Sequence, residues 1–202
     1  MSRAVAEEDR RPLDAYWTPD PIARRLVGVL PVGEGHHVLE PHAGGGAFVR
    51  ALMAADCRCV DAYDIDPTAP AIQKRLWPHA RACRDFLSIE GGTWDWIVGN
   101  PPFKGAEEHV RHALALTRRH VVFLLRLAFL ESAQRLPFWR EHPARKVWVL
   151  AQRPSFLGTG GTDSAAYGWF WWDNEHAGPT TMDVLDMDPP RGEQVGLFGG
   201  EE

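Results

Sequence analysis

Residues 100–103, Asn-Pro-Pro-Phe, combine residue types that could grip a planar group bearing an NH2. They follow the apolar run 94–99, which is short enough to be a buried strand. Two prolines cannot continue that strand, because each lacks a backbone donor and has a fixed φ. An amide side chain, backbone carbonyl oxygens and an aromatic ring therefore meet at the carboxyl end of a strand, where open α/β sheets bind ligands. The plainer interpretation is a proline-rich turn that carries no chemistry.

A glycine-rich turn at 41–46 joins a strand predicted at 37–40 to a helix predicted at 47–55. Glycines allow the backbone to approach a ligand closely and supply positive φ at no steric cost. The strand ends in the acid Glu40. This order of strand, glycine-rich turn and helix is typical of proteins that bind nucleotide-containing cofactors.

Two later predicted strands each end in an acid followed by an apolar side chain. These pairs are Asp64-Ile65 after the strand 58–63 and Asp85-Phe86 after the strand 81–84. An acid at the end of the second strand is placed to accept hydrogen bonds from ribose hydroxyls. Asp64 is preferred to Asp66 for this role, because Ile65 would then follow as an apolar wall for a purine. The plainer interpretations are a turn-initiating Asp64 and a helix-capping Asp85.

The remaining pattern alternates helices with strands. Further helices are predicted at 19–30, 69–77, 106–119 and 127–139, and further strands at 120–126, 145–151 and 167–173. Thr18 is predicted to cap the first helix, with Pro19 at its first position, and Pro137 to end or kink the last one. The final two strands are joined by a loop alone, so they should be antiparallel. The prediction is an α/β Rossmann-like fold with a seven-stranded, mostly parallel sheet, one antiparallel strand and helices on both faces.

Length and composition indicate one domain, or one domain with tails. The chain has 202 residues, of which 45% are hydrophobic, and a net charge of −5, so bulk electrostatics do not indicate a nucleic-acid binder. Residues 1–14 are expected to be flexible, 15–175 to form the catalytic domain and 176–202 to form a C-terminal tail. The sequence has no apolar stretch of membrane-spanning length, which predicts a soluble, cytoplasmic protein with no membrane partner.

No metal site is predicted. The three cysteines form no Cys-x-x-Cys pair and no even framework, which is typical of buried thiols in a reducing compartment. His109 and His112 share a helix face, but no third ligand lies near them in sequence.

Taken in order, the motifs between Tyr16 and about Asp173 resemble those of class I S-adenosylmethionine-dependent methyltransferases that act on amino groups. The chain looks most like the DNA adenine-N6 enzymes of bacterial or phage orphan type. The resemblance implies S-adenosyl-L-methionine as cofactor, with the segment 16–19 holding its methionine carboxylate and Glu40 meeting its amino group. The cofactor-binding residues implied in this way are Tyr16, Thr18, Glu40, Pro41, Ala43, Gly44, Gly46, Asp64, Ile65, Asp85 and Phe86.

Residues Asn100, Pro101, Pro102 and Phe103 match the catalytic [DNS]-P-P-[YFW] motif of that group. By similarity, the side-chain oxygen of Asn100 and the carbonyl oxygen of Pro101 accept hydrogen bonds from the target NH2 and localise its lone pair. Phe103 would stack on the flipped base, and Phe156 could be a second wall or a core aromatic. The function implied is methyl transfer to N6 of adenine in DNA, in a bacterial or phage-infected cell.

Several features leave alternatives open. Phe103 stands where Tyr is common, and residues 174–202 after the last predicted strand are too few for the large target-recognition domain that such enzymes often carry. Specificity would then come from the loop 155–166, from the tail or from a second subunit in a homodimer. The same motif serves RNA adenine or guanine amines and the glutamine amide of release factors, and a non-catalytic scaffold is a further alternative. Cytosine C5 methylation is excluded, because no Pro-Cys pair supplies its nucleophile.

The tail carries a separate signal. Residues 194–198, with Gln194, Leu197 and Phe198, resemble the QxxLF peptide that docks bacterial replication and repair proteins on the sliding clamp. Leu197 and Phe198 would fill an apolar pocket while Gln194 bonds at its rim. The alternative is that both apolar side chains pack on the domain.

Overall fold

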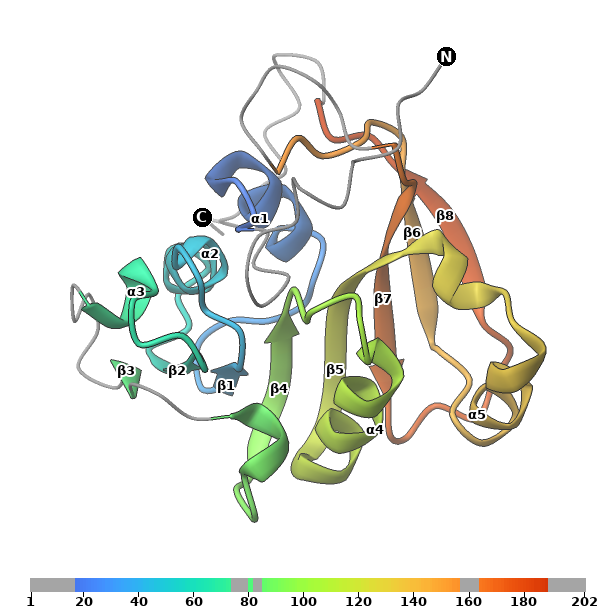
Figure 1. The fold of residues 1–202 in the computed structure, drawn as a ribbon, viewed down its shortest axis with the longest axis horizontal. Coiled ribbons are helices and arrows are strands. Elements are labelled where there is room, and N and C mark those ends of the chain that lie inside the picture. Colours follow the sequence, from blue (N-terminus) through green and yellow to red (C-terminus); the bar gives the residue numbers. More distant parts are fainter. Residues whose placement is uncertain (1–16, 74–79, 82–84, 157–163, 189–202) are drawn as a thin grey trace, which may run out of the picture.

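The structure is a computed structural model that describes residues 17–73, 80–81, 85–156 and 164–188. Within these residues, one eight-stranded sheet forms the centre of the molecule (Figure 1), with strand order β3-β2-β1-β4-β5-β7-β6-β8. All neighbouring strands are parallel except β7, which is antiparallel to both β5 and β6. The seven predicted strands and the single antiparallel one are therefore confirmed.

Most strand bounds lie within one or two residues of the predicted ones, but β5 begins at Thr117, where a helix was predicted to continue to 119, β8 was not predicted, and residues 82–84 of the predicted strand 81–84 lie outside the described residues. The strands are β1 His37–Glu40, β2 Cys59–Tyr63, β3 Ala80–Arg81, β4 Trp94–Gly99, β5 Thr117–Arg126, β6 Lys146–Leu150, β7 Tyr167–Asp173 and β8 Thr181–Leu185. Every residue of β7 is buried, because it lies between two strands and both of its faces are covered. A continuous apolar run such as this is typical of a strand with both faces buried.

Helices cover both faces of the sheet, as predicted. They are α1 Asp20–Val27, α2 Ala47–Ala54, α3 Pro70–Gln73, α4 Ala106–Leu116 and α5 Leu136–Glu141. Leu26 of α1 and Leu52 of α2 pack with Val98 on one face. Val110 of α4 and Phe138 of α5 pack with inward residues of the other face. Each face thus has its own apolar core. The site forms where β1, β2 and β4 end, between these two cores.

Two local predictions about helix ends are wrong. The first helix begins at Asp20 with Pro19 as its N-cap residue, and no side chain caps it. Thr18 therefore does not serve as the cap. Pro137 lies in the first turn of α5 rather than ending a helix, a position where its missing N–H costs nothing. The segment before it, which was predicted as mostly helical, consists of two short 3-10 turns, Leu127–Leu130 and Ala133–Arg135.

The sheet extends beyond the predicted domain boundary at residue 175. Strand β8 pairs in parallel with β6 from Lys146↔Thr181 to Leu150↔Leu185. Four of its five residues are exposed, so no buried apolar pattern marked it in the sequence. The strand is thus defined by its pairing with β6 and not by an apolar pattern of its own.

In the described part of the chain, no helix is long and apolar enough to cross a membrane.

Candidate active site

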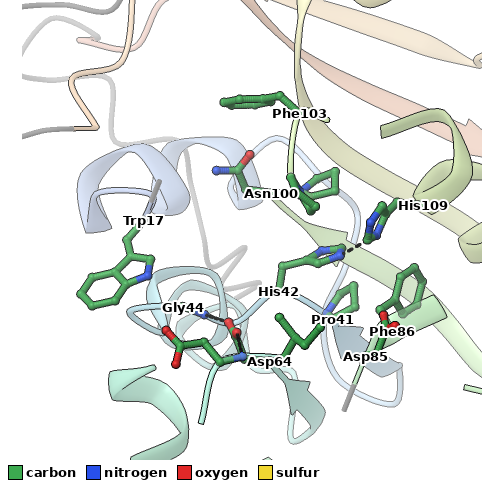
Figure 2. A pocket seen from close by; sticks show the side chains of 14 residues that line it. Trp17, Pro41, His42, Gly44, Asp64, Asp85, Phe86, Asn100, Phe103 and His109 are labelled. Carbon is green, nitrogen blue, oxygen red and sulfur yellow. Dashed lines mark hydrogen bonds between the residues drawn. The ribbon is translucent and has the colours of Figure 1, made fainter. Parts of the chain in front are cut away.

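A pocket lies at the edge where β1, β2 and β4 end (Figure 2). Its volume is about 910 Å³ when its open mouth is included. The lining residues are Trp17, Pro41, His42, Gly44, Asp64, Ile65, Asp66, Asp85, Phe86, Asn100, Pro101, Pro102, Phe103 and His109. Two of the acids predicted to hold a cofactor, Asp64 and Asp85, therefore share one cavity with Gly44 of the glycine-rich turn and with residues 100–103.

Asn100 leaves β4 at the rim of this pocket. Strand β4 pairs with β5 as far as Gly99, and the two prolines then end the ladder. Nδ2 of Asn100 donates a hydrogen bond to Oγ1 of Thr18 over 3.2 Å. Figure 2 shows the amide oxygen of Asn100 on the side of Phe103 and the nitrogen on the opposite side. The amide oxygen is itself a buried atom.

Phe103 lies at the mouth of the pocket among other large side chains. The guanidinium of Arg126, at the end of β5, lies over its ring at 4.6 Å from the centroid. Tyr167 and Phe156 contact it from the side, with centroids 5.5 and 6.4 Å away. Phe156 is itself 8% exposed and lies in the core cluster behind Phe103, outside the set that lines the pocket.

The glycine-rich turn is fixed by Asp64, at the end of β2. Its Oδ2 accepts a hydrogen bond from the N–H of Gly44 over 2.7 Å, and its Oδ1 accepts one from the N–H of Asp66 over 2.8 Å. Burial raises the pKa of Asp64, while these two hydrogen bonds lower it. Gly44 has a φ of 46°, and a Cβ at this position would lie 2.7 Å from Cδ1 of Trp17. Glycine is therefore required where the turn passes under the indole.

Glu40 lies behind the turn and is almost fully buried, at 1% exposure. Burial raises its pKa to about 8, although the hydrogen bond from the N–H of His42 lowers it, and the charge of Asp64 raises it further. Space for this carboxyl depends on Gly99, because a Cβ there would collide with Oε1 of Glu40 and lie 3.1 Å from its Cδ. A buried acid of this kind favours a cationic partner.

The far wall of the pocket is formed by Asp85 and Phe86. Asp85 caps the short helix Phe86–Ser88 by accepting a hydrogen bond from the N–H of Leu87 over 3.0 Å. Phe86 is buried, at 2% exposure, whereas Ile65 is 51% exposed at the pocket edge. Asp85 is thus both the helix cap of the plainer interpretation and a pocket residue.

Two histidines in the pocket wall were missed as site residues. Nε2 of His42 and Nδ1 of His109 are 2.9 Å apart and share one hydrogen bond, which Figure 2 marks. Burial lowers the pKa of both rings, so the pair is neutral and holds a single proton between the two nitrogens. The rings also pack on Phe86, with His109 stacked at 5.8 Å. The two positions are 67 residues apart, and no local pattern pairs them.

The predicted residues fall into three groups. Pro41, Gly44, Asp64, Ile65, Asp85, Phe86 and Asn100 to Phe103 line the pocket. Thr18, Glu40, Ala43, Gly46 and Phe156 lie in the structure without lining it. Tyr16, Gln194, Leu197 and Phe198 lie outside the described residues. Trp17, His42, Asp66 and His109 line the pocket without having been predicted to do so.

These residues fit S-adenosyl-L-methionine. The Asp64 carboxylate at the end of β2 suits ribose hydroxyls, and the ring of Phe86 in the pocket wall suits a purine. Glu40, at the end of β1, lies buried behind the turn. Gly44 leaves the backbone open to close approach. Among the described residues, no group of three or more His, Cys, Asp and Glu side chains could hold a metal ion.

Comparisons with known proteins point the same way. No protein-family model matches the chain. It is similar to the type II methyltransferase M.TthHB8I of Thermus thermophilus, at 29% identity over 109 residues, or 54% of the chain and 25% of the relative. The chain thus spans about a quarter of the length of this relative.

Solved structures share the fold. A Listeria monocytogenes protein described as a class I S-adenosylmethionine-dependent methyltransferase has a TM-score of 0.66 at 12% identity, over 91% of the chain and 70% of that protein. The methyltransferase subunit of a type I restriction-modification system from Streptococcus thermophilus has a TM-score of 0.64 at 12% identity, over 81% and 46%. The chain therefore has the fold of class I S-adenosylmethionine-dependent methyltransferases, and the residues of its pocket fit S-adenosyl-L-methionine.

Proposed function

We propose that the chain transfers a methyl group from S-adenosyl-L-methionine to N6 of adenine in DNA. The observation that carries the proposal is the position of Asn100, Pro101 and Phe103 on the wall of the pocket that also holds Gly44 and Asp64. A nucleophile gripped by the first set would lie next to a cofactor bound by the second.

The chemistry rests on two acceptors. An exocyclic adenine amine is a poor nucleophile, because its lone pair is delocalised into the ring. The side-chain oxygen of Asn100 and the carbonyl oxygen of Pro101 accept its two N–H groups and localise that pair on nitrogen. Fixed acceptors of this kind lower the barrier through orientation and electrostatics rather than by proton abstraction. The bound cofactor supplies an electrophilic sulfonium methyl.

Phe103 supplies a stacking surface for the target base. A base inside a duplex must be flipped out at a cost of roughly a few kcal/mol, and stacking on an aromatic ring offsets about 1–3 kcal/mol of it. Arg126, over the same ring, places a positive charge at the mouth of the pocket, where it suits the nucleic-acid backbone. A local positive charge can attract DNA phosphates even though the net charge of the chain is negative.

The test is a transfer assay with S-adenosyl-L-methionine tritiated in the methyl group. Unmodified duplex DNA, single-stranded DNA, ribosomal RNA and release-factor protein are incubated separately. Asn100→Ala removes the proposed acceptor. Asn174→Ala is the matched control. Its amide donates hydrogen bonds to the carbonyl oxygens of Leu114 and Thr117, at the end of the sheet where β4 and β5 begin and Asn100 does not lie.

The expected result is label in DNA, recovered as N6-methyladenine, lost in Asn100→Ala and retained in Asn174→Ala. Label in RNA or in release factor instead would keep the transfer chemistry and overturn DNA as the substrate. The absence of label in every substrate, with cofactor still bound, would support a non-catalytic scaffold.

A second proposal concerns a partner, the bacterial sliding clamp, through residues 194–198. Its basis is the match of Gln194, Leu197 and Phe198 to the clamp-binding peptide. A labelled peptide of residues 190–202 should bind the clamp with micromolar affinity by fluorescence anisotropy, and a peptide with Leu197→Ala and Phe198→Ala should not. Equal behaviour of the two peptides would remove the proposal.

A further inference from the structure

Exposed positive charge follows the ends of three strands beside the pocket. Strands β4 and β5 are parallel, and β5 and β6 are both antiparallel to β7, so β4, β5 and β6 all end at the edge of the sheet that carries the site (Figure 1). Lys104 follows β4, Arg126 is the last residue of β5, and Arg153 follows β6. All three residues are exposed.

The cations at the opposite edge of the sheet are paired with acids. The ion pairs there join Arg58 to Asp56, Arg118 to Asp95, and both Arg119 and Arg145 to Asp173. Lys104 and Arg153 differ, because neither forms an ion pair with a residue that the structure describes. Their charge is therefore available to an anionic partner.

Arg126 connects this charge to the proposed base-stacking ring. Its guanidinium lies 4.6 Å from the centroid of Phe103. A guanidinium can stack on an aromatic ring and still direct its N–H groups to a phosphate. A nucleotide whose base contacts Phe103 would therefore bring its own phosphate close to Arg126.

The edge that carries the site is divided by charge. On the side of β2 and β3, Asp64 and Asp85 line the pocket and suit a cationic cofactor. On the side of β4, β5 and β6, the three exposed cations suit an anion. Beyond them, at the end of β8, Asp186 accepts a hydrogen bond from Gln152 over 2.6 Å, so negative charge bounds the cationic stretch.

We propose that Lys104, Arg126 and Arg153 form a phosphate-binding strip that holds the sugar–phosphate backbone of the strand carrying the target base. This inference rests on the proposed function and specifies the form of its substrate, a polynucleotide rather than a free nucleotide or a protein side chain. Strands β4 and β6 are three strand spacings apart, about 14 Å, which corresponds to roughly four nucleotides at about 3.4 Å of rise each. Phosphate contacts position a strand without reading its sequence.

The test is the salt dependence of nucleic-acid binding, because each phosphate contacted by a cation releases counterions. Fluorescence anisotropy of a labelled oligonucleotide gives the binding constant at a series of salt concentrations. Lys104→Gln, Arg126→Gln and Arg153→Gln each remove one charge, and Arg153→Lys keeps it. Arg118→Gln is the matched control, because Arg118 lies at the other end of the strand that ends in Arg126, with a side chain that is 61% exposed.

Each of the three charge-removing variants should lower the slope of log K against log salt by about 0.9 with duplex DNA and by about 0.7 with a single strand. Affinity at about 0.1 M salt should fall about threefold to tenfold. Arg153→Lys and Arg118→Gln should keep the wild-type slope. The affinity for S-adenosyl-L-methionine should change less than about twofold in every variant, because the cofactor binds on the acidic side of the edge.

Three outcomes would overturn the inference. The slope could stay at its wild-type value in the charge-removing variants, or fall equally in Arg118→Gln. A mononucleotide could displace the oligonucleotide as effectively as an unlabelled oligonucleotide does, which would reduce the strip to a site for a single anion. Thermal unfolding of each variant shows whether a change in binding reflects a loss of fold.

Binding is measured without methyl transfer, so this inference and the proposed function can fail separately. Methylation of DNA with unchanged slopes would leave the function standing and remove the strip. Binding that depends on the three cations, in a protein that methylates no nucleic acid, would support the strip and remove the proposed function.

Discussion

Oε1 of Glu40 accepts a hydrogen bond from the backbone N–H of His42 over 2.9 Å, and this is the bond that ties the end of β1 to the glycine-rich turn. One backbone donor does not compensate for complete burial, so the pKa of Glu40 remains raised, at about 8. Near pH 7 the carboxyl is therefore mostly protonated in the cofactor-free protein. Binding of a cationic group beside this carboxyl should therefore release its proton, and the release can be measured.

Cofactor binding is expected to release close to one proton at pH 7. A cationic amino group beside Glu40 favours the carboxylate and lowers its pKa, so the affinity should rise as the pH increases from 6 to about 8. Above roughly pH 8 it should fall again, because the amino group of the free cofactor then loses its proton. Calorimetric titration in buffers of different ionisation enthalpy measures the proton release. Glu40→Gln should abolish the proton release and the rise in affinity, and proton release that persists in this variant would show that another group titrates.

Gly99→Ala is expected to destabilise the protein by about 1–3 kcal/mol, because its Cβ would displace the buried carboxyl of Glu40. Cofactor affinity should fall with it. Gly33→Ala is the matched control, since its Cβ would make only an ordinary contact, 3.5 Å from the carbonyl oxygen of Ala55. Chemical unfolding and cofactor titration check the pair, and similar effects of the two substitutions would contradict the steric argument.

Replacement of Phe103 should lower kcat/KM for DNA and leave the affinity for the cofactor unchanged. Phe103→Leu removes a stacking surface worth about 1–3 kcal/mol, which corresponds to roughly 5- to 150-fold in kcat/KM for DNA. Phe103→Tyr keeps the ring and should remain within a few-fold of the wild type. Fluorescence of 2-aminopurine at the target position measures flipping directly. Equal fluorescence with Phe103→Leu and the wild type would exclude stacking on this ring.

Protein stability should fall as the pH drops from about 6.5 to about 4, through His120. Burial lowers the pKa of this ring to about 4, with smaller contributions, in opposite directions, from Asp173 and nearby cations. The unfolded chain therefore binds a proton over this range that the folded protein does not, and unfolding is favoured. Nδ1 of His120 also accepts a hydrogen bond from Nε1 of Trp171 over 3.2 Å, which requires an unprotonated nitrogen. His120→Gln should reduce the dependence of the melting temperature on pH between 4.5 and 7.5, to which His42 and His109 also contribute, and an unchanged slope would contradict the assignment.

The sequence predicted those parts of the site that depend on strand ends. Asn100, Asp64 and Asp85 each follow a strand at a position that the alternation of elements made readable, and parallel strands bring such ends to one edge. Strand β7 was equally readable, because its long apolar run fits burial on both faces.

What could not be predicted depends on contacts between distant residues. Thr18 before a proline has the local signature of a helix cap, and only the folded chain reveals that its hydroxyl meets Asn100 instead. The bond between His42 and His109 has no local signature at all. Strand β8 was missed because an exposed edge strand is formed by its neighbour's backbone rather than by its own apolar pattern.

The reversed direction of β7 has a consequence for how such a protein can diversify. Because β6 and β7 are antiparallel neighbours, β6 ends and β7 begins at the edge that carries Asn100. The chain between Leu150 and Tyr167 must therefore leave from and return to the rim of the site, whatever its length or composition. A segment with both ends anchored in this way can be exchanged as a cassette while the strand that presents Asn100 stays unchanged. Its length and composition can therefore change without any change in β4.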